Sequence, residues 1–263
     1  MIQTFESVDA LRKLVDYIWI ADFDFLVAES REDIIMPQGH INIIFNYGSA
    51  YKRIGAKQET IIPNAAVIGQ IKTAKYVQYG SCLHQVGISL TPLGFITLFD
   101  VPSIQLTERI VNAVEVDSGL NDMYRAIINY NDVELKISAI HHALLHKLSQ
   151  RKADTVRMEE MLNYVEREYK NLSIATMAEF FSVSVSTLER VFKRKVGLPP
   201  KTYGDIIKFR KLTEDKENRS VMQQHYYDQS HLIKTSKRFA GKTIKELERP
   251  TNEITLSYLW NDQ

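Results

Sequence analysis

The stretch LSIATMAEFFSVSVSTLERVFKRKVGLPPKTY, residues 172–203, predicts two short helices joined by a tight turn. Ser173 is placed to cap the first helix, because its hydroxyl can accept a hydrogen bond from a first-turn N–H group. Apolar residues then recur with the spacing of a helix that buries one face: Ile174, Met177, Ala178 and Phe181. The segment Ser182-Val183-Ser184 interrupts this pattern and offers a second cap.

The second helix of this stretch has one apolar and one polar face. The residues expected on the buried face are Leu188, Val191, Phe192 and Val196. The residues expected on the outer face are Ser186, Thr187, Glu189, Arg190, Lys193 and Arg194. Gly197 can adopt the left-handed conformation that ends a helix, and Pro199-Pro200 prevents continuation. A further helix is expected from about Lys201, with Tyr203, Ile206 and Ile207 buried.

The charge of this region indicates DNA binding. Between Arg190 and Lys211 there are eight lysines and arginines against the single acidic residue Asp205. A recognition helix needs short polar side chains for base edges and cations for phosphates. We therefore expect Ser184, Ser186, Thr187, Glu189 and Arg190 to face bases, and Lys193, Arg194 and Lys201 to face phosphates. The alternative is an ordinary solvated helix face, which is what most charge runs are.

The same residues resemble the first helix-turn-helix of AraC/XylS-type transcription regulators of bacteria. The matching pattern is Leu172-Ser173, Ala178, Ser184, Thr187-Leu188, Arg190, Phe192-Lys193, Gly197, Pro200 and Tyr203. The resemblance covers about residues 157–249 and implies a linker helix and a second helix-turn-helix near residues 226–241. In that unit Asp228 or Ser230 would cap the helix, and Ile233, Ser236 and Phe239-Ala240 would form its inner face, ended by Gly241. The DNA-facing residues there would be Gln229, Ser230, His231, Lys234, Lys237 and Arg238.

The second unit departs from the family pattern and is expected to be degenerate. Its first helix is shortened, with Val221-Met222 as its apolar anchors and His225 where a turn glycine is usual. Ser236 replaces a core aromatic residue, and a buried serine without a partner costs free energy. We therefore predict that the second unit contributes less to DNA binding than the first.

Composition suits a two-domain protein. The 263 residues carry a formal net charge of only +1, but residues 1–154 hold 14 lysines and arginines against 17 acidic residues, and residues 155–263 hold 19 against 15. This asymmetry favours a β-rich regulatory domain over residues 1–150 and a DNA-binding domain over residues 155–263. The single cysteine excludes an internal disulfide. Neither a signal peptide nor an apolar run long enough for a membrane span is found, so we expect a cytoplasmic protein that does not insert into membranes.

The first half predicts strands after a helical start that Ser7 would cap. The runs 39–48, 65–71 and 83–90 are short, rich in β-branched residues and bounded by glycine and proline. They indicate a small sandwich or barrel, and they resemble the cupin-like sensor domain often joined to AraC-type DNA-binding domains. The expected fold class is therefore α+β: a β-rich, cupin-like barrel, a helical linker and an all-α pair of helix-turn-helix units.

No residues suggest catalysis, a cofactor or a metal. His40 and His84 each stand alone, and His142 and His146 lack the glutamate of a zinc-protease motif. Cys82 and His84 would share a strand face without a third group to orient them, so both are interpreted as structural. Inward strand residues would line a pocket for a small-molecule effector, or would simply fill the core: Phe45, Tyr47, Ile68, Tyr76 and His84.

Residues 120–150 predict two helices whose apolar stripe either packs on the barrel or forms the seam of a homodimer. The stripe is Val133, Ile137, Ile140, Leu144 and Leu148. The chain is thus expected to be a non-enzymatic, sequence-specific transcription regulator that binds double-stranded DNA. RNA polymerase is a further partner that this interpretation allows. The alternative is a cupin-like small-molecule binder or enzyme with a helical tail that does not bind DNA.

Overall fold

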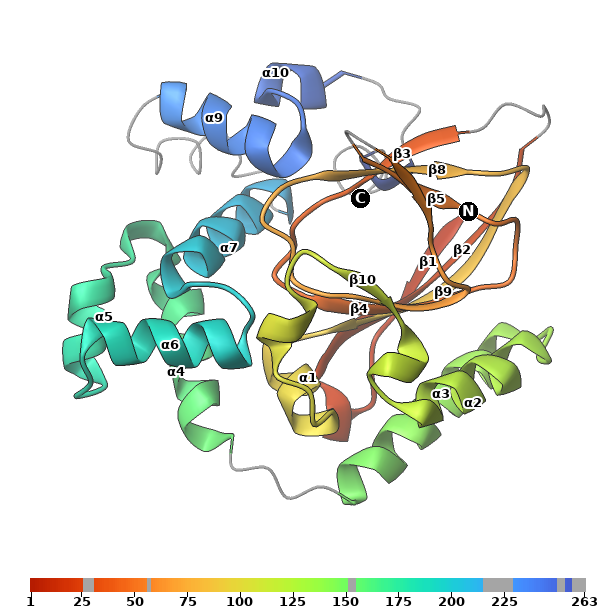
Figure 1. Ribbon diagram of the computed structural model, residues 1–263, viewed down its shortest axis with the longest axis horizontal. Helices are drawn as coiled ribbons and strands as arrows, with labels where there is room; N and C mark the ends of the chain where they lie inside the picture. Colours follow the sequence, from red (N-terminus) through yellow and green to blue (C-terminus); the bar gives the residue numbers. More distant parts are fainter. Residues whose placement is uncertain (26–30, 56–57, 151–154, 215–228, 250–253, 257–263) are drawn as a thin grey trace.

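The computed structural model describes residues 1–25, 31–55, 58–150, 155–214, 229–249 and 254–256. Two antiparallel sheets form the β-rich half and face each other (Figure 1). The six-stranded sheet has the order β1 (Ile2–Phe5), β2 (Val15–Asp24), β9 (Cys82–Leu90), β4 (Ile41–Asn46), β7 (Ala65–Ile68) and β10 (Ile110–Asn112). The four-stranded sheet has the order β3 (Arg31–Ile35), β8 (Lys75–Tyr79), β5 (Lys52–Ile54) and β6 (Glu59–Ile61).

Helices and 3₁₀ turns follow the strands along the chain. Those that belong to the β-rich half are η1 (Asp9–Leu11), α1 (Pro92–Leu98), η2 (Ser103–Leu106), η3 (Ala113–Glu115), α2 (Ser118–Ile128) and α3 (Val133–Ser149). Those of the helical half are α4 (Val156–Glu168), η4 (Tyr169–Asn171), α5 (Ile174–Phe180), α6 (Val185–Lys195), α7 (Pro200–Glu214), α9 (Gln229–Ala240), α10 (Ile244–Leu247) and α11 (Ile254–Leu256). No helix in the described parts of the chain is long and apolar enough to cross a membrane.

The expected α+β fold class is confirmed. The three predicted strand runs correspond to β4, β7 and β9, and the two helices expected between residues 120 and 150 correspond to α2 and α3. In α3, Ile140 and Leu144 are fully buried within the chain, against α1, α2 and η1. Packing within the chain is therefore observed for these two residues; Val133, Ile137 and Leu148 are half-buried, and the homodimer seam stays a prediction.

The helical start expected near Ser7 is wrong. Only the single turn of η1 forms, and β2 begins at Val15. Buried Val15 and Ile18 fit a helical spacing, but they also lie in a run of β-branched and aromatic residues. Pairing with β9, from Val15 opposite Leu90 to Asp24 opposite Cys82, decides between the two, because strand formation depends on neighbours that local sequence does not contain.

One large hydrophobic cluster and two smaller ones organise the interior. The large cluster extends from the helix-covered face of the six-stranded sheet through α1, α2 and α3 into α4, α5, α6, α7 and α9. One small cluster lies between the two sheets and includes Ala21, Tyr51, Tyr79 and Ile254. The other consists of Ile44, Ile68 and Ile71. Strand β4 has a different cluster on each face: Ile43 and Phe45 point to the helices, while Asn42 and Ile44 point into the space between the sheets. The six-stranded sheet is therefore buried on both faces, and the helical half packs against the barrel through the large cluster.

Candidate nucleic-acid interface

Helix α6 is capped and packed as its sequence predicts. The Ser184 hydroxyl accepts a hydrogen bond from the Thr187 N–H group at 3.1 Å, and Leu188 and Phe192 are fully buried. Gly197 has φ +90° and ends the helix, which is why a residue without a side chain stands there. Helix α5 begins in the same way, since the Thr176 N–H group donates to Ser173 Oγ at 3.3 Å.

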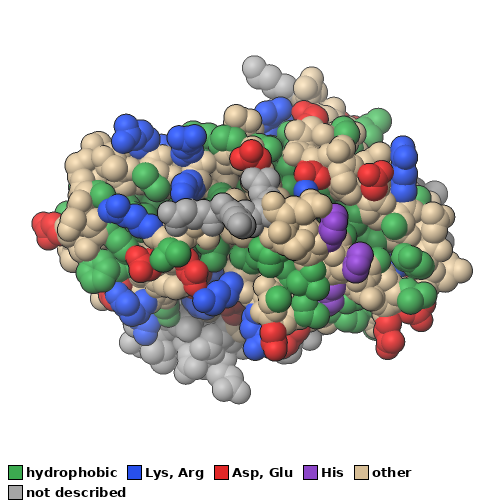
Figure 2. Space-filling model, turned by 90° about the horizontal axis from the view of Figure 1, so that it is seen from below, with side chains coloured by type: hydrophobic (Ala, Val, Ile, Leu, Met, Phe, Trp, Pro, Cys, Tyr) green, Lys and Arg blue, Asp and Glu red, His purple; other side chains and the backbone are tan. Residues whose placement is uncertain are grey.

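The outer face of α6 carries the residues predicted to contact DNA. Exposed among them are Ser184, Ser186, Arg190, Arg194 and, at the start of α7, Lys201; half-buried are Thr187, Glu189 and Lys193. The Ser184 hydroxyl also lies 3.0 Å from Ser186 Oγ and 3.0 Å from Thr187 Oγ1, so it is hydrogen-bonded to both of these hydroxyl groups. Glu189 pairs with Lys193 at 3.2 Å. Figure 2 shows lysines and arginines gathered over the left half of one face of the molecule.

Helix α9 presents a second, smaller polar face. All six residues predicted to face DNA there are exposed: Gln229, Ser230, His231, Lys234, Lys237 and Arg238. Arg238 is already engaged, because its Nε donates to the Lys72 carbonyl at 3.1 Å, and its own carbonyl accepts from Ala74 N at 3.0 Å. The barrel thus holds the C-terminal end of α9.

Two expectations for α9 are wrong. Ile233, expected on the inner face, is 42% exposed, and Leu232 is buried in its place. Ser236 is fully buried as expected, but it has a partner: its hydroxyl donates to the Lys242 carbonyl at 2.5 Å. This bond satisfies the polar group and closes the turn after the helix at Gly241, so the serine does not carry the predicted cost. Asp228 and the first helix of this unit, with Val221, Met222 and His225, lie outside the described residues.

The barrel also holds the C-terminal end of α6, a contact that sequence reasoning missed. Ser103 Oγ donates to the Lys195 carbonyl at 2.6 Å, and Thr107 Oγ1 donates to the Gly197 carbonyl at 2.7 Å. These carbonyls belong to the last turn of the helix and the residue that ends it, where backbone acceptors have no partner within the helix. Polar residues in a connecting segment give no sequence signal for such a contact.

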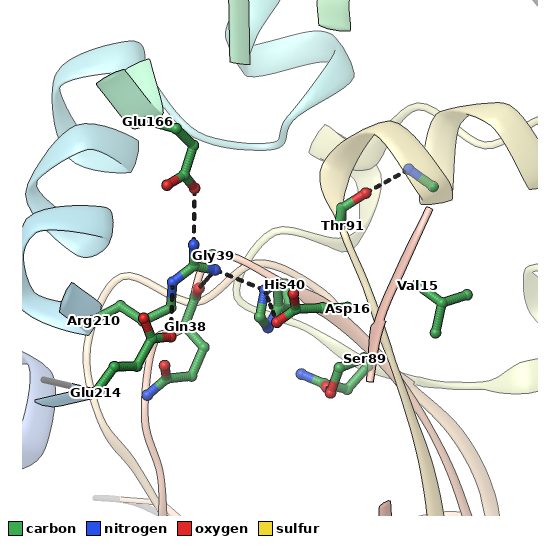
Figure 3. Close-up of polar contacts among 12 residues, drawn as sticks. Val15, Asp16, Gln38, Gly39, His40, Ser89, Thr91, Glu166, Arg210 and Glu214 are labelled. Atoms are coloured by element: carbon green, nitrogen blue, oxygen red, sulfur yellow. Dashed lines mark hydrogen bonds and ion pairs between the residues drawn. The ribbon is translucent and has the colours of Figure 1, made fainter. Parts of the chain in front are cut away.

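Helix α7 attaches the helical half to the barrel through Arg210 (Figure 3). One terminal nitrogen of its guanidinium donates to His40 Nε2 at 2.7 Å and to the Gln38 carbonyl at 3.2 Å. The other terminal nitrogen donates to Glu166 of α4 at 2.8 Å. Arg210 was counted in the basic run of residues 190–211, but it is only 8% exposed and cannot serve an outer face.

The Gln38-Gly39-His40 turn is shaped to meet α7. Gly39 has φ +78°, and a Cβ there would stand 3.1 Å from Tyr203 and 3.2 Å from Ile207 of α7. His40 is buried, as expected for a structural histidine. Burial, and next the charge of Arg210, lower the pKa of His40 well below its usual 6.5. Asp16 lies 3.2 Å from His40 Nε2, but that nitrogen accepts a hydrogen bond from the Arg210 guanidinium, which requires a neutral imidazole.

We expect stability to depend on pH through His40. Because its pKa is lower in the folded chain than in the unfolded one, the unfolded chain binds more protons below about pH 6.5. The free energy of unfolding should therefore fall as pH drops from 7.5 to 5.5, by at most about 1.4 kcal/mol per pH unit for this one group. Urea unfolding of the His40→Gln variant, which keeps an acceptor for Arg210, should show a smaller fall. Equal falls in both proteins would contradict a neutral, buried His40.

The residues predicted to line an effector pocket do not come together. A cavity does lie between the sheets, and of the five only Ile68 lines it. Phe45 points into the helix-covered cluster, and Tyr76 is 41% exposed beside Gly241 at the end of α9. Tyr47 and His84 stack on each other with ring centroids 6.0 Å apart, outside this cavity. Alternation identifies the two faces of a strand, but here both faces are buried, so it cannot tell which one meets the cavity.

His84 has the orienting group that the sequence did not reveal. Asp22, opposite it on β2, lies 2.5 Å from its Nδ1, and Asp24 lies 3.3 Å from its Nε2. Cys82 accepts from the Ser49 N–H group at 3.2 Å. Within the parts of the chain that are described, Asp24, Cys82 and His84 form the one group whose spacing suits a metal ion, with ligand atoms within 4.8 Å of one another. Asp24 is largely exposed, and nothing further marks this group as a binding site.

The chain is similar in fold to solved structures that include those of ToxT from Vibrio cholerae. One ToxT structure has 9% sequence identity and a TM-score of 0.53, covering 99% of each chain. An apo ToxT variant has 8% identity and a TM-score of 0.51, covering 92% of this chain and 98% of that one. ToxT bound to (E)-4-(8-methylnaphthalen-1-yl)but-3-enoic acid has 9% identity and a TM-score of 0.50, covering 98% and 99%.

Comparison of sequences identifies no protein of known function that is related to the chain. Residues 3–112, which span the described strands apart from Ile2 of β1, match the family model DUF6597, a domain of unknown function. No curated protein sequence matches the chain. At identities near 9%, the likeness to ToxT is a likeness of fold.

Proposed function

We propose that the chain is a sequence-specific DNA-binding transcription regulator whose β-rich half binds a small-molecule effector and forms a homodimer. The observation that carries this proposal is helix α6. It is capped, it buries Leu188 and Phe192 completely, and it leaves Arg190 and Arg194 exposed on the opposite face. A helix held so firmly on one side and basic on the other suits the DNA major groove. The fold shared with ToxT supports the same interpretation.

Each side chain has a role in this proposal. Ser184, Ser186 and Thr187 are tied together by their hydroxyl groups, so their contacts to bases are modest and shared with the helix cap. Arg190 then becomes the main base-reading residue, because it is exposed and its fork of donors matches guanine. Glu189 also faces bases, and Lys193, Arg194 and Lys201 hold phosphates. Helix α9 adds Gln229, Ser230, His231, Lys234, Lys237 and Arg238, and contributes less, since Arg238 is bonded to the barrel.

The test is a salt titration of DNA affinity with the full chain and a fragment that the intact protein selects from genomic DNA. Three phosphate contacts from the first unit predict a slope of log affinity against log salt of about −3 per protomer. No measurable binding at low salt would overturn the proposal. It would favour the alternative of a small-molecule binder with a helical tail that does not bind DNA.

Alanine variants of the two units separate their contributions. Arg190→Ala should weaken binding to the selected fragment about tenfold, the loss expected for one base-reading arginine. Lys237→Ala should weaken it less than threefold, because a single phosphate contact in the weaker unit is lost. Arg12→Ala is the control, since Arg12 is an exposed arginine of the barrel that pairs with Asp9. Affinity measured by fluorescence anisotropy decides: equal losses from Arg190 and Lys237 would contradict the unequal roles.

A further inference from the structure

A cavity of about 140 Å³ lies between the two sheets and is partly open to solvent. Its walls are mainly apolar and come from both sheets, with Trp19, Ile34, Ile44 and Leu83 among them. We infer that this cavity binds an uncharged molecule of about the size of one aromatic ring that carries a hydrogen-bond acceptor. This inference deepens the proposed function, since it names the chemical class of the effector and its site.

The charge of the lining excludes an anionic ligand. Among the described residues, Asp33 is the only charged residue of the lining. Its carboxylate is 1% exposed and accepts hydrogen bonds from the backbone N–H groups of Ile34, at 2.8 Å, and Thr255, at 3.1 Å, and from the Thr255 hydroxyl at 3.0 Å. A second carboxylate beside it would be desolvated with no cation to pair with. The acid bound by ToxT is therefore of the wrong charge for this cavity.

Two polar groups of the cavity lining are hydrogen-bond donors that favour a ligand with a hydrogen-bond acceptor. The Tyr51 hydroxyl and the Gln38 side-chain nitrogen are buried, and neither donates a hydrogen bond to an acceptor among the described residues. Tyr51 is only 3% exposed, and burial raises its pKa more than its contact with the Gln85 side chain lowers it, so that its hydroxyl keeps its proton. A buried donor that makes no hydrogen bond costs free energy, and a carbonyl or ether oxygen of a ligand would accept hydrogen bonds from these two donors.

The size of the cavity limits the ligand. An apolar protein cavity of about 150 Å³ accommodates benzene. The present cavity is of that size, and its open side leaves room for a small substituent. A single ring with a carbonyl group therefore fits, whereas a long acyl chain or a fused ring system with a long side arm would need the walls to move.

Occupancy of the cavity can reach the helical half by two contacts. Ile254 and Thr255, which follow the second unit in sequence, line the cavity and close it beside Asp33. Gln38 lies in the lining, and its own carbonyl accepts from Arg210 of α7 at 3.2 Å. A ligand bonded to the Gln38 side chain thus sits next to the turn that holds α7 on the barrel.

Three probes with nine non-hydrogen atoms each test the inference on the full chain: acetophenone, benzoate and cumene. Titration calorimetry at pH 7.5 should give acetophenone at least tenfold tighter binding than benzoate, which is charged at that pH. Acetophenone should also bind about fivefold more tightly than cumene, which has the aromatic ring but no hydrogen-bond acceptor. Benzoate binding as tight as acetophenone, or no binding of any probe, would overturn the inference.

Variants assign the binding to this cavity. Tyr51→Phe should reduce the affinity for acetophenone to within about twofold of the affinity for cumene. Tyr130→Phe is the control, because it removes a hydroxyl from a half-exposed tyrosine outside the cavity, and it should leave the affinities for acetophenone and cumene unchanged. Ala21→Leu fills the cavity and should abolish binding of both probes; Ile68→Phe does the same if the first variant fails to fold. Retained binding in a folded, filled variant would place the ligand elsewhere and overturn the assignment.

The DNA affinity of the same preparations separates this inference from the proposed function. If acetophenone binds but DNA does not, the proposed ligand site is kept and the proposed function as a transcription regulator is overturned. Salt-dependent DNA binding without any binding of the probes would leave the regulator standing and overturn the site. If both hold, saturating acetophenone should change DNA affinity by at least twofold, and the Ala21→Leu variant should lose that response.

Discussion

Replacement of Phe192 by alanine is expected to lower the free energy of unfolding by about 3–5 kcal/mol, the range found for buried Phe-to-Ala changes. Phe192 is fully buried at the centre of α6, and its ring lies 6.4 Å from that of Tyr203 of α7. The alanine would leave a cavity at the point where the recognition helix packs on the linker helix. DNA binding should be lost with it, because Arg190 lies two residues away, on the opposite face of the same helix.

A matched variant controls for the loss of an aromatic ring. Phe180, at the end of α5, is 64% exposed and contacts Tyr164 and Phe181 from the surface. Phe180→Ala should therefore cost less than about 1 kcal/mol, since little apolar area leaves the interior. Urea unfolding followed by circular dichroism measures both. Similar losses from the two variants would mean that the apolar stripe of α6 does not anchor the helix.

The sequence predicted α5, α6 and α7 well, and the physical reason is that their signals are local. Caps at Ser173 and Ser184, an apolar stripe and a glycine with positive φ all lie within a few residues of the structure they determine. The barrel shows the opposite case. Val15 and Ile18 fit a helix as well as a strand, and only pairing with β9, some seventy residues away, resolves the ambiguity.

The candidate sites divide in the same way. The outer face of α6 was predicted residue by residue, because a helix with one buried face has one polar face left. The residues that line the cavity were not predicted, because Phe45 and Ile44 are both buried and sequence alternation does not tell which of them faces the other sheet. Arg210 was counted only as one charge of the basic run, because its partners His40 and Gln38 are about 170 residues away in sequence. Contacts between the two halves carry no local signal.

Arg210→Met is expected to cost about 2–3 kcal/mol of stability and to loosen the helical half from the barrel. Arg210 is 8% exposed and bonds His40, Gln38 and Glu166 at once. Removal of one partner of a buried pair costs about 3–5 kcal/mol when the other charge is fully buried. The expected loss is smaller here because the Glu166 side chain keeps 32% of its exposure, so water can solvate the carboxylate left behind.

A double-mutant cycle with His40 shows whether this loss comes from the contact between the halves. His40→Leu combined with Arg210→Met should be about 1–2 kcal/mol less destabilising than the sum of the single changes, because the two residues share a hydrogen bond. Lys211→Met is the control: Lys211 is 35% exposed at its side chain, its carboxylate neighbours lie 3.8 and 3.9 Å away, and its loss should cost under about 0.5 kcal/mol. Additive effects of the His40 and Arg210 variants would mean that Arg210 stabilises α4 and α7 alone. In that case the Gln38-Gly39-His40 turn would not transmit the state of the cavity to the DNA-binding helices.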